Sequence, residues 1–203
     1  MKGFVFAIAV VTCMFSPVHA GAEAPDEFIS AIVDDLAQRI EGRRDELSAD
    51  PDTLQALIDE VLLPRFDRGQ AAQDVLGDHW WEASEEQRTR FIAAFYSVLL
   101  QRYAERLLEF EHDRVEVLPY RGDPTTKKIV YVTTRVDLVD GSNVTVYYEL
   151  TARDSSWIII NFQFESFSFV GNFLEQYGLE IRDTSLEQLI TRLEDEAAGS
   201  VDE

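Results

Sequence analysis

Side chains able to do acid–base, nucleophilic or metal chemistry are scarce in this sequence, apart from carboxylates. Beyond residue 20 the histidines are His79 and His112, and neither belongs to a ligand pattern such as HxxxH or HExxH. The single cysteine is Cys13, and no GxGxxG, GxSxG or phosphate-loop motif occurs. With 38 Asp and Glu residues a carboxylate pair is uninformative, because a solvated acidic surface is their usual role. We therefore expect neither a catalytic residue nor a metal site.

The charge balance narrows the classes of binding partner. The 203 residues carry 18 Lys and Arg against 38 Asp and Glu, a formal net charge of -20. Nucleic acid is excluded, because phosphate binding needs clustered cations that displace counterions. The same charge disfavours a basic patch that holds the protein on anionic lipid. The excess of acid fits either a saline habitat, where salt screens the self-repulsion, or simply an acidic protein.

Bulky apolar surface is the feature that stands out. A capping box at Ser84 and Gln87 opens a long helix that continues to about Phe110. After Asp113 the hydrophobic period changes from helical to alternating, which predicts strands. Large side chains of the helix and strands then form either a filled core or the wall of an apolar cavity. The candidate cavity residues are Phe91, Phe95, Leu99, Tyr103, Val130, Val132, Val136, Val146, Tyr148, Ile160, Phe162 and Phe164.

The elements that must position these residues follow from the same periodicity. Helices are expected over 25–47, 51–62, 65–76 and 168–177, with a last helix capped by Asp183. Strands are expected over 115–117, 130–138, 144–150 and 157–165, with Ile158, Ile160, Phe162 and Phe164 on one side of the last. Helices followed by an antiparallel meander predict one α+β domain, with a curved sheet of about four strands and helices against its concave face.

Residues 1–20 have the parts of a secretory signal peptide. Lys2 is followed by an apolar stretch too short to span a bilayer, and Val18 and Ala20 occupy the small-residue positions before a cut. A lipoprotein leader acylated at Cys13 is the alternative, and the residues before Cys13 fit it poorly. We expect residues 21–203 to form a single exported, soluble domain without a disulfide.

Several short motifs of moderate specificity occur in the same order and at similar spacing as in a known protein family. They are Leu62-Leu63-Pro64 with Phe66, Val75-Leu76-Gly77, Trp80-Trp81, Gln87-Arg88, Trp157, Glu165, Ser168, Asn172-Phe173 and Gln176-Tyr177-Gly178. Over about Pro25 to Leu193 the chain resembles the MlaC family, the periplasmic substrate-binding component of the Mla phospholipid transport system. The family is also called the toluene-tolerance or ABC-transporter auxiliary family.

The resemblance implies an NTF2-like sheet with helices that enclose a deep apolar pocket for phospholipid acyl chains. It implies no cofactor other than the bound phospholipid as cargo, and no catalytic residue. It also implies traffic between an outer-membrane lipoprotein complex and an inner-membrane ABC transporter carrying an MCE-domain protein, which maintains outer-membrane lipid asymmetry. The departures are Asn161 for a usual Asp, Ser166 for a usual Gly and Leu174 for a usual Arg, and they concern the partner surface more than the pocket.

Two other functions stay open from the residues. An NTF2-like enzyme of isomerase or dehydratase type would place an Asp or His inside an apolar pocket and raise its pKa. A periplasmic adaptor would have a filled core and would bind no lipid. Lipid that co-purifies with the protein separates the carrier from the adaptor. The direction of transport, the head-group preference and the number of chains bound are left undetermined by the sequence.

Overall fold

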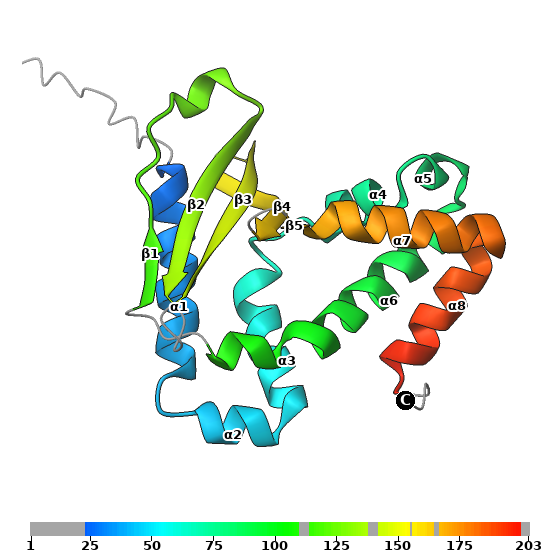
Figure 1. Ribbon diagram of the computed structural model, residues 1–203, viewed down its shortest axis with the longest axis horizontal. Coiled ribbons are helices and arrows are strands. Elements are labelled where there is room, and N and C mark those ends of the chain that lie inside the picture. The colour runs from blue at the N-terminus through cyan, green and yellow to red at the C-terminus, as the bar shows by residue number, and fades with distance from the viewer. Residues whose placement is uncertain (1–22, 110–113, 138–141, 155, 165–166, 200–203) are drawn as a thin grey trace, which may run out of the picture.

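A computed structural model describes residues 23–109, 114–137, 142–154, 156–164 and 167–199 of the chain (Figure 1). The expected leader and His112 lie outside these ranges. The helices are α1 Pro25–Ile40, α2 Arg44–Ala49, α3 Pro51–Leu62, α4 Arg68–Leu76, α5 His79–Glu82, α6 Glu85–Tyr103, α7 Phe169–Asp183 and α8 Leu186–Ala197. The strands are β1 Val115–Val117, β2 Ile129–Asp137, β3 Asn143–Arg153, β4 Ser156–Phe164 and β5 Phe167–Ser168, and two 3-10 helices cover Glu105–Glu109 and Pro124–Thr126.

Local capping chemistry sets where several helices begin. The Ser84 hydroxyl accepts from the Gln87 backbone N–H at 3.1 Å, and the Gln87 side chain accepts from the Ser84 N–H at 3.1 Å. This confirms the predicted capping box at the start of α6. Asp50 caps α3 by accepting from the Thr53 N–H at 3.2 Å, and Pro51 occupies the first helical position.

Helix ends depart from the sequence prediction at four places. α4 begins at Arg68 and not at residue 65, because residues 65–67 bond to β4. The first predicted helix is two helices, because Gly42 takes a positive φ of 72° between α1 and α2. α6 ends at Tyr103 and passes into a 3-10 helix instead of continuing to Phe110. α7 runs through Gly178 to Asp183, and α8 is capped by Ser185, not by Asp183.

The sheet is antiparallel throughout, with the strands in sequence order β1 to β5. The predicted four strands are present, and the two-residue β5 is an additional one. Segment 65–67 protects the free edge of β4: the Asp67 N–H donates to the Ile159 carbonyl and the Ile159 N–H donates to the Arg65 carbonyl, both at 2.8 Å. The chain between α3 and α4 is therefore fixed to the sheet.

A β-bulge in β4 corrects the predicted face of that strand. Glu149 pairs with Asn161 and Leu150 pairs with Ile159, so Ile160 is an extra residue in β4. The bulge buries Ile159 and Ile160 together. Ile158 therefore does not share one face with Phe162 and Phe164, because the alternation changes parity at the bulge.

The buried apolar residues form three clusters and not one continuous core. A helical cluster joins α4, α6, α7 and α8 and contains Phe91, Phe95, Phe169 and Tyr177. A sheet cluster packs α1 against β2, β3 and β4. An α2–α3 cluster lies between the end of α1, the end of α6 and these two helices. Figure 1 shows the corresponding separation, with the sheet and α1 on one side and α7 and α8 on the other.

Candidate functional site

An apolar stripe on α6 emerges from the helical cluster toward the C-terminal end of the helix. Phe91 and Phe95 are 0% and 3% exposed, and their rings stack with centroids 5.5 Å apart. One turn further on Leu99 is half-buried, and Tyr103 is 40% exposed. The stripe is thus packed at its start and only partly covered at its end.

A second stripe on β4 emerges in the same region. Phe162 is half-buried and Phe164 is 36% exposed. The Phe162 ring stacks on Phe169 at 4.5 Å, and Tyr103 meets Phe169 edge-on at 6.2 Å. Phe169 at the start of α7 therefore brings the exposed ends of the α6 and β4 stripes together.

The region where the stripes meet is called the apolar joint here. Phe66, from the chain between α3 and α4, contributes a ring 6.4 Å from Phe162. Tyr148 on β3 is the cross-strand partner of Phe162 and lies on the same face of the sheet. The residues of the apolar joint are Phe66, Leu99, Tyr103, Tyr148, Phe162 and Phe164, all of which keep accessible surface.

Tyr148 is a partly buried phenol of the apolar joint. Burial is the largest cause of a raised pKa at its phenol, and the neighbouring Thr134 hydroxyl opposes the shift. The Tyr148 side chain nevertheless keeps part of its accessible surface. Thr134 Oγ1, which is fully buried on the adjacent strand, has no hydrogen-bond partner of ordinary geometry among the described residues.

The structure brings only part of the predicted cavity set together. Leu99, Tyr103, Tyr148, Phe162 and Phe164 belong to the apolar joint. Phe91 and Phe95 belong to the packed helical cluster, and Val130 and Val132 belong to the sheet cluster under α1. Val136, Val146 and Ile160 are buried, at 6%, 6% and 7% exposure. The buried helix residues Phe91 and Phe95 therefore lie in a different cluster from the buried sheet residues Val130 and Val132.

Phe66 and Phe169 are the two apolar-joint contacts that the predicted set missed. Phe66 precedes α4 and lies in the expected helix 65–76, whose predicted period did not show its contact with the sheet. Its position depends on the bridge between residues 65–67 and Ile159, a contact between segments far apart in sequence. The only signal available was the run of motif residues around Pro64 and Phe66.

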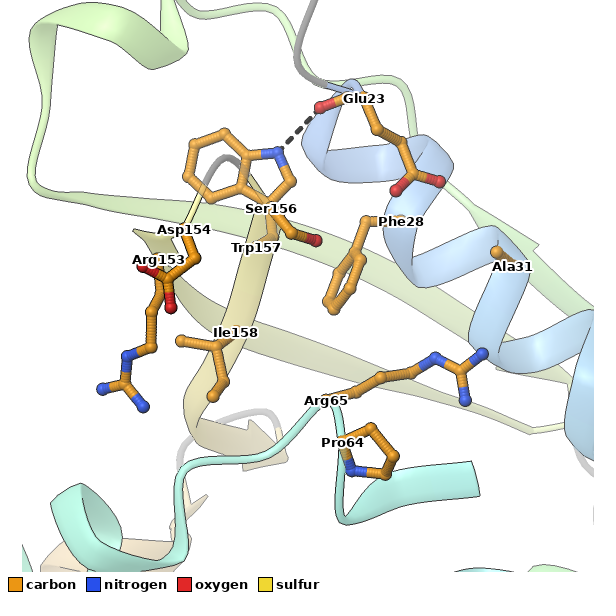
Figure 2. A pocket seen from close by; sticks show the side chains of 10 residues that line it. All are labelled: Glu23, Phe28, Ala31, Pro64, Arg65, Arg153, Asp154, Ser156, Trp157 and Ile158. Atoms are coloured by element: carbon orange, nitrogen blue, oxygen red, sulfur yellow. Dashed lines mark hydrogen bonds between the residues drawn. The ribbon is translucent and has the colours of Figure 1, made fainter. Parts of the chain in front are cut away.

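An open cavity of about 460 Å³ lies between the N-terminal end of α1 and the start of β4 (Figure 2). Its wall is mixed, with Phe28 and Trp157 beside Arg65, Arg153 and Asp154. In Figure 2 the Trp157 indole points toward Glu23, and its Nε1 donates to the Glu23 carbonyl at 2.7 Å. This bond ties the start of α1 to the sheet. None of the apolar-joint residues borders this cavity.

A second open cavity, of about 320 Å³, lies beside the edge of β2. It is bordered by Leu118, Tyr120 and Arg121 from the loop after β1, and by Lys127 and Tyr131. Val130 is the only predicted cavity residue at either opening. The expected deep apolar pocket is therefore not one of these two cavities.

The titratable side chains of the described residues do not gather into a metal-binding group. His79 Nδ1 lies 3.6 Å from Glu82 Oε2 within α5. Burial raises the pKa of Asp74, and burial followed by the charge of Asp74 raises the pKa of Glu149. Within residues 23–199, apart from the short gaps, no group of three His, Cys, Asp or Glu side chains could hold a metal ion.

Comparison with known proteins gives consistent matches over most of the chain. The family model described as MlaC protein matches residues 30–195. The chain is 22% identical over 208 residues to the intermembrane phospholipid transport system binding protein MlaC of Haemophilus influenzae, covering 98% of this chain and 95% of that protein. It is 22% identical over 158 residues to the toluene tolerance protein ttg2D of Pseudomonas putida, covering 76% of this chain and 71% of that protein.

A solved structure shares the fold. It is a phospholipid-binding protein from Ralstonia solanacearum, determined in complex with a phospholipid. The two structures superpose with a TM-score of 0.76 at 22% sequence identity, and the match covers 87% of this chain and 98% of that one. In the described part of this chain, no helix combines the length and the apolar character needed to cross a membrane.

Proposed function

The chain belongs to the MlaC family, and we propose that it is a phospholipid carrier that holds acyl chains at the apolar joint. The observation that supports this site is the convergence of two partly uncovered apolar stripes, from α6 and β4, around Phe169. Uncovered aromatic and aliphatic surface that continues from a packed core is suited to an apolar ligand. The names of the relatives and of the solved structure support phospholipid as that ligand.

The energetic need for a carrier follows from the ligand. Exposing an acyl chain of about 16 carbons to water costs roughly 0.8 kcal/mol per CH₂, or on the order of 12 kcal/mol per chain. An apolar enclosure lowers this cost without any covalent step. We therefore assign the chain no catalytic residue and no cofactor, and treat the phospholipid as cargo.

The apolar joint must open as cargo enters. Leu99 and Phe162 pack against the helical cluster, whereas Phe66 and Tyr148 pack against the sheet cluster, so the apolar joint lies between two separately packed clusters. The residues of the apolar joint include no Lys or Arg. We infer that the head group of the lipid stays outside the apolar joint and that the protein discriminates weakly between head groups.

Location and partners complete the proposal. The leader at residues 1–20 would export the chain to the periplasm, where it would pass lipid between an outer-membrane lipoprotein complex and an inner-membrane ABC transporter with an MCE-domain protein. Such traffic would maintain the lipid asymmetry of the outer membrane. The name of the Haemophilus influenzae relative supports membership of an intermembrane transport system.

The decisive experiment is extraction and mass spectrometry of lipid bound to protein purified from cells. We expect intact phospholipid of several head-group classes, and exchange with added labelled phospholipid. Chemically altered lipid would indicate an enzyme. Protein that is folded, lipid-free and unable to take up labelled phospholipid would refute the carrier function.

A matched pair of variants on α6 tests the site. Leu99→Asp places a carboxylate among acyl chains, which costs several kcal/mol when the charge is unpaired, so lipid uptake should fall by roughly tenfold or more. Ala93→Asp adds the same charge to an exposed position of the same helix and should leave uptake unchanged. Normal uptake by folded Leu99→Asp protein would place the lipid elsewhere.

A further inference from the structure

One stretch of the β2 edge has no neighbouring strand. β1 pairs with residues 134–136 of β2, and beyond it the Leu118 N–H donates to the Thr133 carbonyl at 2.9 Å. Backbone groups in an antiparallel strand alternate between its two sides, so Ile129 and Tyr131 direct theirs to the same side as Thr133. The carbonyl of Lys128 points the other way, because it accepts from Thr151 Oγ1 on β3 at 2.9 Å.

The open backbone groups line the second cavity. Ile129 and Tyr131 are 38% and 56% exposed, and both border the 320 Å³ opening. The opposite wall is the loop after β1, which includes Leu118, Tyr120 and Arg121. Within the described part of the chain, no hydrogen bond engages the outward backbone groups of Ile129 and Tyr131. The opening therefore combines apolar walls with backbone donors and acceptors.

Positive charge gathers at this opening. Arg121 and Lys127 border it and Lys128 follows, and all three are exposed. Among the described residues, none of the three makes an ion pair, whereas Arg90 and Arg192 each pair with carboxylates on α7 or α8. In a chain of net charge -20, these free cations are a local exception. They attract an acidic partner to the edge of β2.

We propose that the edge of β2 at Ile129 and Tyr131 binds an extended acidic segment of a partner protein, which adds to the sheet as a strand. Backbone hydrogen bonds would supply affinity, and Arg121 and Lys127 would select acidic side chains. A second copy of this chain is disfavoured, because it would place these cations against their own copies. A flat anionic membrane supplies no backbone partners. The inference does not depend on what the apolar joint carries.

A blocked synthetic peptide that alternates glutamate and valine tests the proposal on the intact protein. We expect it to bind, and to bind roughly tenfold or more tightly than a peptide that alternates lysine and valine. N-methylation of alternate peptide groups should abolish binding, because it removes the donors of the added strand. Higher salt should weaken the complex.

Two variants at Tyr131 separate the backbone from the side chain. Tyr131→Pro removes the outward N–H, and proline is tolerated on an open strand edge, so binding should be lost while the fold is kept. Tyr131→Ala keeps the N–H and should retain most of the binding. If the proline variant fails to fold, the double variant Arg121→Glu with Lys127→Glu provides the test and should lose binding of the acidic peptide.

Three results would overturn the proposal. The first is equal binding of the N-methylated and unmethylated acidic peptides. The second is binding to phosphatidylglycerol vesicles that Arg121→Glu abolishes, with no binding of the acidic peptide. The third is a concentration-dependent dimer in sedimentation that Lys127→Glu disrupts.

Discussion

Glu149 is a carboxylate whose surroundings oppose its charge. Burial is the first cause of its raised pKa, the Asn161 side chain on the neighbouring strand opposes the shift, and the charge of Asp74 adds to it. Asp is the charged counterpart of this amide. An Asp there would add a third acid beside Glu149 and Asp74, so the amide of Asn161 relieves a repulsion that this acidic chain would otherwise carry.

The raised pKa of Glu149 predicts that Glu149→Gln increases the stability of the protein in a pH-dependent way. The folded pKa lies above the unfolded value of about 4.3, so the wild-type protein loses stability as pH rises through the folded pKa. Removing the charge should therefore raise the unfolding free energy at pH 7 by about 0.5 kcal/mol, after allowance for partial exposure. The gain should vanish below about pH 4, where the carboxyl is neutral in both states.

Urea unfolding at the two pH values measures the effect. Glu175→Gln, at an exposed position of α7, is the matched control and should change the midpoint little at either pH. A loss of stability in Glu149→Gln at pH 7 would show that the carboxylate makes a favourable interaction that outweighs its burial.

At the scale of elements, the apolar stripe of α6 has two structural roles along its length. Its first half is packed against α7 and α8, since Phe91 meets Tyr177 edge-on at 6.2 Å. Its second half ends at Tyr103 in the apolar joint. The same helix face thus passes from core to candidate lining within three turns.

This division predicts different effects of two alanine variants on stability and on lipid uptake. Phe91→Ala should lower the unfolding free energy by about 3–5 kcal/mol, because it leaves a cavity in a packed cluster. Tyr103→Ala should lower it by about 1 kcal/mol or less, since the side chain is already 40% exposed, and should weaken phospholipid uptake severalfold. Urea unfolding and a labelled-lipid exchange assay measure the two effects. Equal stability losses, or no change in uptake for Tyr103→Ala, would contradict the division.

Elements whose ends depend on local chemistry were predictable from the sequence. The Ser84 capping box and the Asp50 cap involve residues three apart, so their patterns are visible in the chain itself. Gly178 was expected to end α7. The helix instead continues, because a helical glycine costs only about 1 kcal/mol and the adjacent Tyr177 is packed in the helical cluster.

The bulge and the separation of clusters depend on contacts that no local pattern records. Ile160 becomes the extra residue of β4 only through the register with Glu149 and Leu150 on β3. The sequence predicted that the bulky residues of the candidate site share faces of α6 and β3. Which of them are covered depends on where α1, α7 and α8 pack, and hydrophobic period alone does not determine that.

At the scale of the whole molecule, the net charge of -20 sets the response to salt. Ion pairs such as Arg90 with Glu194 at 2.7 Å use some carboxylates, but 38 acids against 18 bases leave many unpaired. Repulsion among them opposes the compact state and is screened over about 10 Å at 0.1 M salt.

We therefore expect the thermal unfolding midpoint to rise between dilute buffer and about 1 M chloride salt. Sodium and potassium chloride should give the same curve, since screening depends on ionic strength. A midpoint that falls with salt would mean that the surface ion pairs outweigh the repulsion. A midpoint that differs strongly between the two cations would mean specific ion binding.

Three separate cores have a consequence for the molecule after delivery. Leu36 and Leu62 link the sheet cluster to the α2–α3 cluster, and Phe162 stands beside the helical cluster from its place on the sheet. A lipid that lies across the apolar joint would add contacts between the sheet and the helical cluster. Binding of the lipid would then also raise the free energy of unfolding of the protein. The carrier would be most susceptible to proteases just after it has released its lipid. Rapid binding of another lipid would then protect the protein.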